Sequence, residues 1–295
     1  VVSALWLYNN LQDPDLIILD ASPKTIDPDF DYTGIAGSRH FDLKNEFSDT
    51  SGELPNMLPS PEQFQNSCKN LGISNSSKIV IYDNVGIYLS PRVWWMFKIM
   101  GHQNVAVLNG GLPEWRRLGY KTVHFEDNII IPGDFEAKFN SEMVKDYCFV
   151  SSNVSLQESV LIDARSAGRF DGKSPEPREG LPSGHIPRSL NLPYTQVLEG
   201  GKFKSRENLS EIFNNLITDE KPLIFSCGSG VTACIILLAS EFVLKNDKSV
   251  YDGSWTEWAQ TKLICNISFS FYWLLFDHAV PPRRKKQPLK FLNSL

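Results

Sequence analysis

The sequence predicts an α/β fold made of tandem copies of one domain, each a parallel sheet with helices on both faces. Short apolar runs alternate with longer stretches of helical pattern, which is the order expected of strands joined by crossover helices. The runs are continuous, as is typical of strands buried on both faces of a parallel sheet. The same order of runs then recurs in the second half of the chain.

Strands and helices are predicted in alternation along the first half. The strands are runs rich in Ile, Val and Leu at 16–22, 78–83 and 105–108. Helical patterns cover 61–71 and 91–97, and a last helix begins within 109–115. Because strands and helices alternate, the strands are expected to pair in parallel.

The second half repeats this order at a nearly constant spacing. Matching residues lie 143 or 144 positions apart, as in the pairs Asp20 and Asp163, Asp83 and Cys227, and Trp115 and Trp258. Extra residues at 171–183 lengthen one loop of the second copy, so Ile186 lies 151 positions after its counterpart Ile35. The shared offset predicts a duplicated domain, in which strands at 160–165 and 223–227 answer the first two strands of the first copy.

The pattern divides the chain into four parts: a first domain at 1–125, a linker at 126–150, a second domain at 151–262 and an atypical tail at 263–295. The tail has 14 mostly apolar residues before a basic cluster, fewer than the roughly 20 that a membrane helix needs. Membrane contact by the tail is therefore not expected. A surface anchor, a helix on the core and a misjoined gene end stay as alternatives, of which the abrupt change in composition favours the last.

Composition sets limits on function. Apolar residues make up 42% and charged residues 21% of the 295 residues, which describes a globular protein. The net charge of −5 argues against binding to nucleic acid over the whole surface. None of the five cysteines forms a Cys-x-x-Cys pair, so neither a disulfide framework nor a metal site is expected. A reducing compartment fits this pattern, and we expect a cytoplasmic location, with the mitochondrion as the alternative.

The strongest functional signal follows the apolar run at 223–225. Cys227 lies at the end of this predicted strand, Gly228, Ser229 and Gly230 come next, and a helical pattern begins at 231. A cysteine at this place faces loop N–H groups and the positive end of a helix dipole, which favour thiolate over thiol. A lone cysteine is more often a small hydrophobe of the core, but the glycines that follow favour a nucleophile. The first copy has Asp83 instead, so the first domain is predicted to be catalytically inactive.

Several motifs together carry a resemblance to a known family. They lie at 90–97, 168–170, 175–178, 184–187, 227–232 and 251–258. In these motifs, over about residues 3–260, the chain resembles the two-domain rhodanese-type sulfurtransferases. In this family a loop reading Cys-Gly-Ser-Gly-Val-Thr goes with 3-mercaptopyruvate as the sulfur donor, whereas relatives that use thiosulfate carry basic residues in place of Gly228 and Ser229.

The resemblance implies a role for each residue of the site. Cys227 would take the sulfur of 3-mercaptopyruvate as a persulfide, release pyruvate and pass the sulfur to cyanide or to a thiol, such as that of a thioredoxin-like protein. Ser229 would offer its hydroxyl to the donor. Arg169 and Arg178 would hold the donor's carboxylate and carbonyl, for which guanidinium is well suited. Substrate contacts are also implied for the loop residues Gly228, Gly230, Val231 and Thr232. No cofactor or metal is implied.

Simpler interpretations exist for these side chains. Arg169 and Arg178 could be solvated surface residues, Ser229 could serve only the turn, and Thr232 could cap the following helix. Outside the loop, we expect Cys234 to pack in the core.

The first copy departs from the family pattern. Its loop at 34–37 reads Gly-Ile-Ala-Gly where the family has His-Ile-Pro-Gly, and that histidine has been proposed to relay a proton with the loop serine. His40 is a weak substitute for it. His185 keeps the second copy's loop, where we expect a structural role. We expect Asp83 to satisfy the N–H groups of its own loop.

Three other functions fit the sequence less well. A phosphatase of the related single-domain type needs an arginine six positions after the cysteine, and Ala233 stands there. A thiosulfate sulfurtransferase is disfavoured because the loop has no cation. A catalytically inactive binding protein is disfavoured because Cys227, Arg169 and Arg178 are all present.

Overall fold

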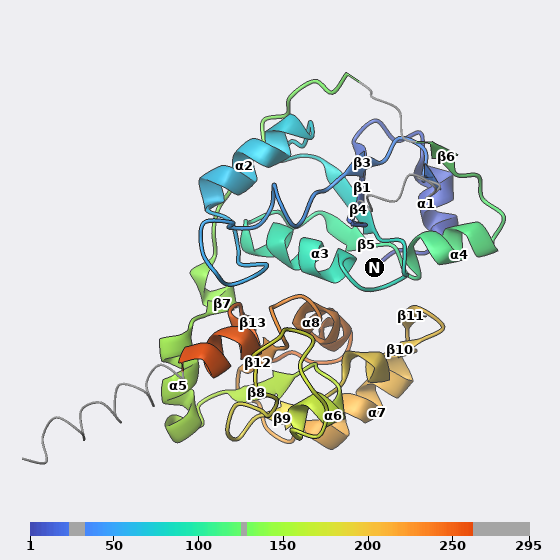
Figure 1. Ribbon diagram of the computed structural model, residues 1–295. Coiled ribbons are helices and arrows are strands. Elements are labelled where there is room, and N and C mark those ends of the chain that lie inside the picture. The colour runs from blue at the N-terminus through green and yellow to red at the C-terminus, as the bar shows by residue number, and fades with distance from the viewer. Residues whose placement is uncertain (24–32, 125–128, 262–295) are drawn as a thin grey trace, which may run out of the picture.

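Two parallel sheets, one in each half of the chain, form the framework of the computed structural model, which describes residues 1–23, 33–124 and 129–261 (Figure 1). The first sheet has the strand order β3-β1-β4-β5, with every pair parallel. Its strands are β1 (Leu16–Asp20), β3 (Arg39–His40), β4 (Lys78–Tyr82) and β5 (Val105–Val107). The strands predicted in the first half are thereby confirmed. Beside the sheet, β2 (Thr33–Gly34) pairs antiparallel with β6 (Val123–His124).

The second sheet has the order β7-β13-β12-β8-β9, again with every pair parallel. Its strands are β7 (Val144–Lys145), β8 (Val160–Asp163), β9 (Leu190–Asn191), β12 (Leu223–Ser226) and β13 (Lys248–Tyr251). A small hairpin, β10 (Leu198–Glu199) and β11 (Lys202–Phe203), extends from this domain. Because β7 pairs with β13, the end of the 126–150 stretch expected as a linker is part of the second sheet.

Helices cover both faces of each sheet (Figure 1). In the first domain they are α1 (Ala4–Asn10), α2 (Pro61–Asn70), α3 (Ser90–Ile99) and α4 (Gly111–Arg117). In the second they include η1 (Ser141–Met143), α5 (Tyr147–Leu156), α6 (Ala167–Phe170), η2 (Tyr194–Val197), α7 (Arg206–Leu216) and α8 (Ala233–Glu241). The described residues 254–261 are helical as well. Helix starts follow local sequence, as at α2, where the Ser60 hydroxyl accepts the N–H of Gln63 and Pro61 occupies the first turn.

Alternation along the strands divides the core into two layers. In β1, Ile17 and Leu19 belong to the apolar cluster that includes residues of α2 and α3. Ile18 between them belongs to a second cluster with residues of α1 and α4. Successive side chains of a strand point to opposite faces, so a continuous apolar run requires a helical layer on each side.

The two domains meet through α3 and α8, which lie against each other (Figure 1). Every residue of α3 except Lys98 is buried, as is every residue of α8 except Glu241. A helix that is apolar all round must be covered on every side. Here one side of each helix packs on its own sheet and the other on the neighbouring domain.

Among the residues that the structure describes, no helix is both long and apolar enough to cross a membrane. The predicted tail at 263–295 lies outside those residues.

Candidate active site

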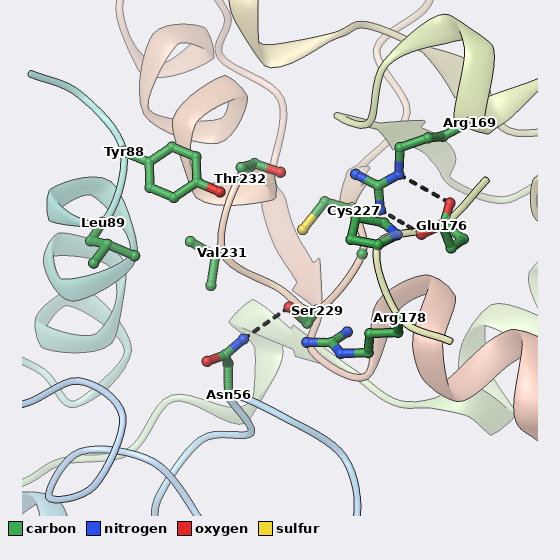
Figure 2. A pocket seen from close by; sticks show the side chains of 12 residues that line it. Asn56, Tyr88, Leu89, Arg169, Glu176, Arg178, Cys227, Ser229, Val231 and Thr232 are labelled. Carbon is green, nitrogen blue, oxygen red and sulfur yellow. Dashed lines mark hydrogen bonds and ion pairs between the residues drawn. The ribbon is translucent and has the colours of Figure 1, made fainter. Parts of the chain in front are cut away.

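A pocket of about 320 Å³ lies between the two domains at the carboxyl end of β12. Ligands of open parallel sheets bind at this end of the strands. The second domain supplies most of its lining: Arg169, Glu176, Pro177, Arg178, Cys227, Gly228, Ser229, Val231 and Thr232. The first domain contributes Asn56, Tyr88 and Leu89 (Figure 2). Of the residues predicted for the site, all line this pocket except Gly230, a loop residue whose carbonyl and N–H bond to residues on the other side of the loop.

Cys227 is the first residue after β12, and its sulfur projects into the pocket (Figure 2). The residue as a whole is 1% exposed. The Cys227 side chain has Arg169 on one side and Thr232 on the other in this view. The sulfur is therefore placed to meet a small molecule in the pocket while the rest of the residue stays packed.

The carbonyl groups of the Cys227 loop are tied away from the pocket. The Cys227 carbonyl accepts the N–H of Trp255 at 3.0 Å. The Gly228 carbonyl accepts the N–H of Thr256 at 3.1 Å and its hydroxyl at 2.6 Å. The Gly230 carbonyl accepts the Cys234 thiol at 3.3 Å and the Arg92 guanidinium at 3.4 Å, both from behind the loop.

These contacts decide where the loop N–H groups point. In a planar trans peptide the N–H lies opposite the carbonyl, so the N–H groups of Gly228, Ser229 and Val231 face the other way, to the pocket side. No hydrogen-bond acceptor is found for these three among the described residues. Unpaired N–H groups that converge at a helix N-terminus favour an anion. The loop is thus a cradle for a thiolate or a persulfide.

Ser254 links the two ends of the Cys227 loop through its hydroxyl group. Its hydroxyl accepts the N–H groups of Cys227 at 3.2 Å and Gly230 at 3.1 Å, and donates to the Tyr251 carbonyl at 2.8 Å. Gly230 has φ +77°, and a Cβ there would lie 3.0 Å from Arg92 Nη1 and from the Asp252 carbonyl. Glycine is required at 230 by both backbone conformation and space.

The first copy shows the same kind of loop around an anion of its own. The buried Asp83 carboxylate accepts the N–H groups of Val85, Tyr88, Leu89 and Ser90 at 2.9–3.2 Å, and the Ser90 hydroxyl at 2.7 Å. The prediction that Asp83 satisfies its own loop is confirmed. A strand, loop and helix arranged in this way therefore hold negative charge where the second copy has Cys227.

Arg169 is held by Glu176 in a two-bond ion pair. Its Nε and Nη2 donate to the Glu176 carboxylate at 3.1 and 2.5 Å. Glu176 also accepts Arg165 Nη1 at 2.8 Å, and it is itself buried. Burial lowers the pKa of Arg169, but Glu176 and the nearby Cys227 outweigh it and raise the pKa above its ordinary value. The Nη1 group of Arg169 has no partner among the described residues and is available to a ligand.

Arg178 is linked to the loop through Thr256. Its Nη1 donates to the Thr256 hydroxyl at 2.7 Å, and that hydroxyl donates to the Gly228 carbonyl. Arg169 and Arg178 both lie on the second-domain wall of the pocket (Figure 2). Two guanidinium groups on one wall of a pocket suit a small anionic ligand. Arg169 is half-buried and paired with Glu176, unlike a solvated surface residue, whereas Arg178 is exposed and is tied to the loop through Thr256.

The first-domain residue that reaches Ser229 is Asn56. Its amide donates to the Ser229 hydroxyl at 2.9 Å, which leaves the hydroxyl hydrogen free to point at a ligand. Neither the 34–37 loop nor His40 lines the pocket. Gly34 is in β2, and His40 Nε2 bonds the Ser22 carbonyl. Neither residue is therefore placed to relay a proton with Ser229, which agrees with the view of His40 as a weak substitute.

Three further predictions are decided by the geometry. Thr232 is at the N-cap position of α8, but its side chain makes no capping hydrogen bond, so the capping interpretation is wrong. Thr232 lines the pocket instead. Cys234 is fully buried, as expected, and burial raises its pKa to about 12. His185 is structural, as expected: its Nδ1 bonds the Phe170 carbonyl and its ring stacks on the Phe170 ring.

Sequence reasoning missed the pocket residues Asn56, Tyr88, Leu89, Glu176 and Pro177. Glu176 lies within a motif that was recognised for its arginine alone. Tyr88 and Leu89 lie in the loop of the first copy that corresponds to the Cys227 loop, and this correspondence could have indicated that they lie near the pocket. No sequence pattern points to Asn56, because its partner Ser229 is 173 residues away.

Within the described residues, no group of three or more His, Cys, Asp or Glu side chains is arranged to hold a metal ion. The pocket presents a cysteine, hydroxyl groups, two guanidinium groups, the Glu176 carboxylate and the Asn56 amide.

Comparison with known proteins agrees with this geometry. A family model described as the rhodanese-like domain matches residues 3–118 and 150–261. The chain is 39% identical over 287 residues to the thiosulfate/3-mercaptopyruvate sulfurtransferase 1, mitochondrial, of Arabidopsis thaliana, covering 88% of this chain and 76% of that protein. It is 38% identical over 272 residues to the 3-mercaptopyruvate sulfurtransferase of Mus musculus, covering 88% and 91%. It is 41% identical over 272 residues to a thiosulfate sulfurtransferase of Rattus norvegicus, with the same coverage.

Solved structures show the same similarity. The crystal structure of SseA from Escherichia coli, a 3-mercaptopyruvate sulfotransferase with the rhodanese fold, superimposes with a TM-score of 0.76 at 34% identity, covering 86% of this chain and 98% of that one. The Tum1 protein of Saccharomyces cerevisiae gives 0.79 at 29% identity, covering 88% and 95%.

Proposed function

This chain belongs to the rhodanese-like family, and from that premise we propose that it is a 3-mercaptopyruvate sulfurtransferase that carries sulfur as a persulfide on Cys227. The observation that carries the proposal is a cysteine in a cradle of unpaired N–H groups, with two guanidinium groups on the adjoining wall. That arrangement matches a donor with a thiol at one end and a carboxylate at the other. Relatives with both 3-mercaptopyruvate and thiosulfate in their names agree with the reaction class.

The donor would bind through its charged end. Its carboxylate and carbonyl would meet Arg169 Nη1 and the Arg178 guanidinium, which places the thiol beside Cys227. Charge-assisted hydrogen bonds from guanidinium fix both position and orientation of a carboxylate. The Ser229 hydroxyl, whose oxygen accepts from Asn56, would donate to the donor's carbonyl oxygen.

The first half-reaction transfers one sulfur atom. The Cys227 thiolate attacks the donor sulfur, so an S–S bond forms as the C–S bond breaks and its electron pair leaves with carbon as the enolate of pyruvate. The proton of the donor thiol moves to that carbon and gives pyruvate, which leaves a deprotonated persulfide on Cys227. Donor sulfur is oxidised and carbon reduced, so no other reagent is needed. The loop N–H groups stabilise the negative charge on the terminal sulfur.

The second half-reaction restores the thiolate. A thiolate or cyanide attacks the outer sulfur, takes it as a persulfide or thiocyanate, and leaves the electron pair on Cys227. We propose a thiol acceptor, such as that of a thioredoxin-like protein, as the physiological one, with no nucleic-acid partner.

Thiosulfate as the main donor is the second candidate, because two arginines also suit a small dianion. The absence of a basic side chain at 228 and 229 disfavours it, because the loop then has no cation of its own to meet a dianion. A Cβ at 228 would lie 3.0 Å from Arg169 Nη2, so a side chain there would require this guanidinium to shift.

The test compares two donors. Pyruvate release from 3-mercaptopyruvate with a thiol acceptor is measured beside thiocyanate formation from thiosulfate and cyanide. We expect the parent to be clearly faster with 3-mercaptopyruvate, and Cys227→Ser to lose about a thousandfold or more with both donors. Cys148→Ser, which changes an exposed cysteine on α5, is the matched control and should behave like the parent.

Each alternative has its own result. Faster turnover of thiosulfate would overturn the donor assignment and keep the reaction class. A folded parent that uses neither donor would favour a catalytically inactive binding protein.

For its location we propose the cytoplasm, with the mitochondrion as the alternative, since the Arabidopsis relative is a mitochondrial protein by name. Fractionation of cells that express the full-length protein separates the two.

A further inference from the structure

A single arginine of the inactive first domain reaches into the catalytic loop of the second. Arg92 is in the first turn of α3 and is 1% exposed. Its Nη1 pairs with Asp252 Oδ1 at 2.7 Å and donates to the Gly230 carbonyl at 3.4 Å. Its Nη2 donates to the Asn56 carbonyl at 2.6 Å. One side chain thus joins three segments that meet behind the pocket.

The contact with Gly230 controls a peptide of the anion cradle. The carbonyl of Gly230 and the N–H of Val231 belong to the same planar unit and point in opposite directions. Holding the carbonyl toward Arg92 therefore holds the N–H of Val231 on the pocket side. Glycine at φ +77° gives this peptide no side chain to restrain it, so an outside contact has to prevent it from rotating.

The contact with Asn56 controls a second part of the pocket. Asn56 has φ +59°, a conformation that few residues other than glycine adopt readily. Arg92 holds its carbonyl, and two residues later the N–H of Leu58 donates to Asp252 Oδ2 at 2.8 Å. This ring of contacts fixes the turn that presents the Asn56 amide to Ser229.

Arginine suits this position for a geometric reason. Its guanidinium is a rigid planar fork that donates in several fixed directions, whereas a lysine ammonium is a single point of charge. The fork also lies over the Trp95 ring, 4.7 Å from the centroid. The buried pair of Arg92 with Asp252 is therefore read as a contact that specifies one geometry of the loop, because a buried ion pair adds little net stability.

We propose that Arg92 is a positioning residue through which the first domain sets the shape of the Cys227 loop and the direction of Ser229. The first domain is then part of the active site although it has no nucleophile. The inference rests on the proposed function for its effect on turnover, but its effect on Cys227 concerns the thiol alone and needs no sulfur donor.

The test variant is Arg92→Lys, which keeps a positive charge beside Asp252 and removes the fork. The rate of Cys227 alkylation by iodoacetamide is followed against pH in the full-length protein. We expect the midpoint of that profile to move up by about one pH unit, the shift that corresponds to loss of one hydrogen bond to a charged group. We expect kcat for 3-mercaptopyruvate to fall by about ten- to a hundredfold, with KM little changed because Arg169 and Arg178 are untouched.

Two comparison variants separate positioning from a looser domain interface. Lys202→Met removes a different interdomain pair, Lys202 with Glu114 at 3.3 Å, and does not touch the loop, so both readouts should match the parent. Asn56→Gly keeps the carbonyl that Arg92 holds and removes the amide from Ser229. It should lower kcat without moving the alkylation midpoint.

The outcomes are distinct. A folded Arg92→Lys protein with the parent's alkylation midpoint and kcat overturns the proposal, as does an equal effect of Lys202→Met. Should Arg92→Lys fail to fold, Asp252→Asn removes the charge that anchors Arg92 and must give the same shift. If the parent turns over neither donor, the proposed function fails, while the alkylation profiles still decide the role of Arg92.

Discussion

Glu176 shows how one side chain prepares the pocket for a donor. Its carboxylate is buried and accepts from two arginines, Arg165 and Arg169. Arg165 is also paired with Asp163 and bonded to the Gly184 carbonyl, so it does not depend on Glu176 for its position. Arg169 has no other partner among the described residues. Glu176 therefore fixes the direction in which Arg169 presents its free Nη1.

A neutral replacement at 176 should weaken donor binding. Glu176→Gln leaves one acceptor oxygen and loses the two-bond pair, so Arg169 regains side-chain freedom that donor binding must then remove. We expect KM for 3-mercaptopyruvate to rise by about tenfold with a smaller change in kcat, measured by steady-state pyruvate release. Asp171→Asn, an exposed acid in the same insertion that pairs with Lys173, is the control. An unchanged KM would refute the assignment of Arg169 to the carboxylate.

At the scale of elements, the strand, loop and helix around Asp83 and those around Cys227 are two versions of one anion-binding unit. In the first copy the group that the loop holds is the carboxylate of Asp83, a side chain of the protein itself. In the second, the anion is a thiolate or persulfide that forms and disappears during turnover. The duplicated fold thus explains why the loop N–H groups of the second copy are left unpaired.

Removal of the built-in anion should destabilise the first domain. Asp83→Ala leaves the N–H groups of Tyr88, Leu89 and Ser90 without the acceptor that the fully buried Asp83 carboxylate provides. We expect a loss of about 2 to 3 kcal/mol in the free energy of unfolding. Urea unfolding should show a lower midpoint at an unchanged slope.

Asp83→Asn is the matched variant, because it keeps one oxygen and the volume of the side chain. The free energy of unfolding should fall less for Asp83→Asn than for Asp83→Ala. Equal stability of Asp83→Ala and the parent would contradict the view that the carboxylate organises this loop.

At the scale of the whole molecule, two kinds of contact hold the domains together. Around α3 and α8 the contact is mainly apolar and buried. Away from the pocket, Lys202 of β11 reaches Glu114 of α4, which also pairs with Arg117. The Arg117 and Lys202 hydrogen bonds lower the pKa of Glu114 to about 2.

The Glu114 pairs, of which only the one with Lys202 joins the two domains, should make the stability of the protein sensitive to acid. A carboxyl whose pKa is lowered on folding adds stability above its unfolded pKa, and this is lost as pH falls from about 4.5 toward 2. Because Arg117 is largely exposed, we expect roughly 1 kcal/mol or less from the pairs. Thermal unfolding at pH 6 and pH 3 should show a smaller difference in Tm for Glu114→Gln than for the parent. An identical difference would exclude Glu114 as a source of acid sensitivity.

The sequence by itself determined the parallel sheets, the duplication and the cysteine loop. Each depends on local information. A short apolar run such as Ile79–Ile81 is typical of a strand buried on both faces of a sheet. Cys227, with glycines at 228 and 230 after it, can form a tight loop before a helix. The repeat offset then placed Asp83 in the first copy at the position that Cys227 occupies in the second. These conclusions needed no knowledge of which segments meet in space.

Only the tertiary structure decided how the first domain enters the active site. Asn56 and Arg92 contact residues of the second domain that are 173 and 138 positions away, and no periodicity or motif spacing relates such residues. Their meeting depends on how α3 docks against α8, which is set by apolar packing over the whole interface. For the same reason the 34–37 loop, which the sequence pointed to, lies away from the pocket, while Asn56 reaches Ser229.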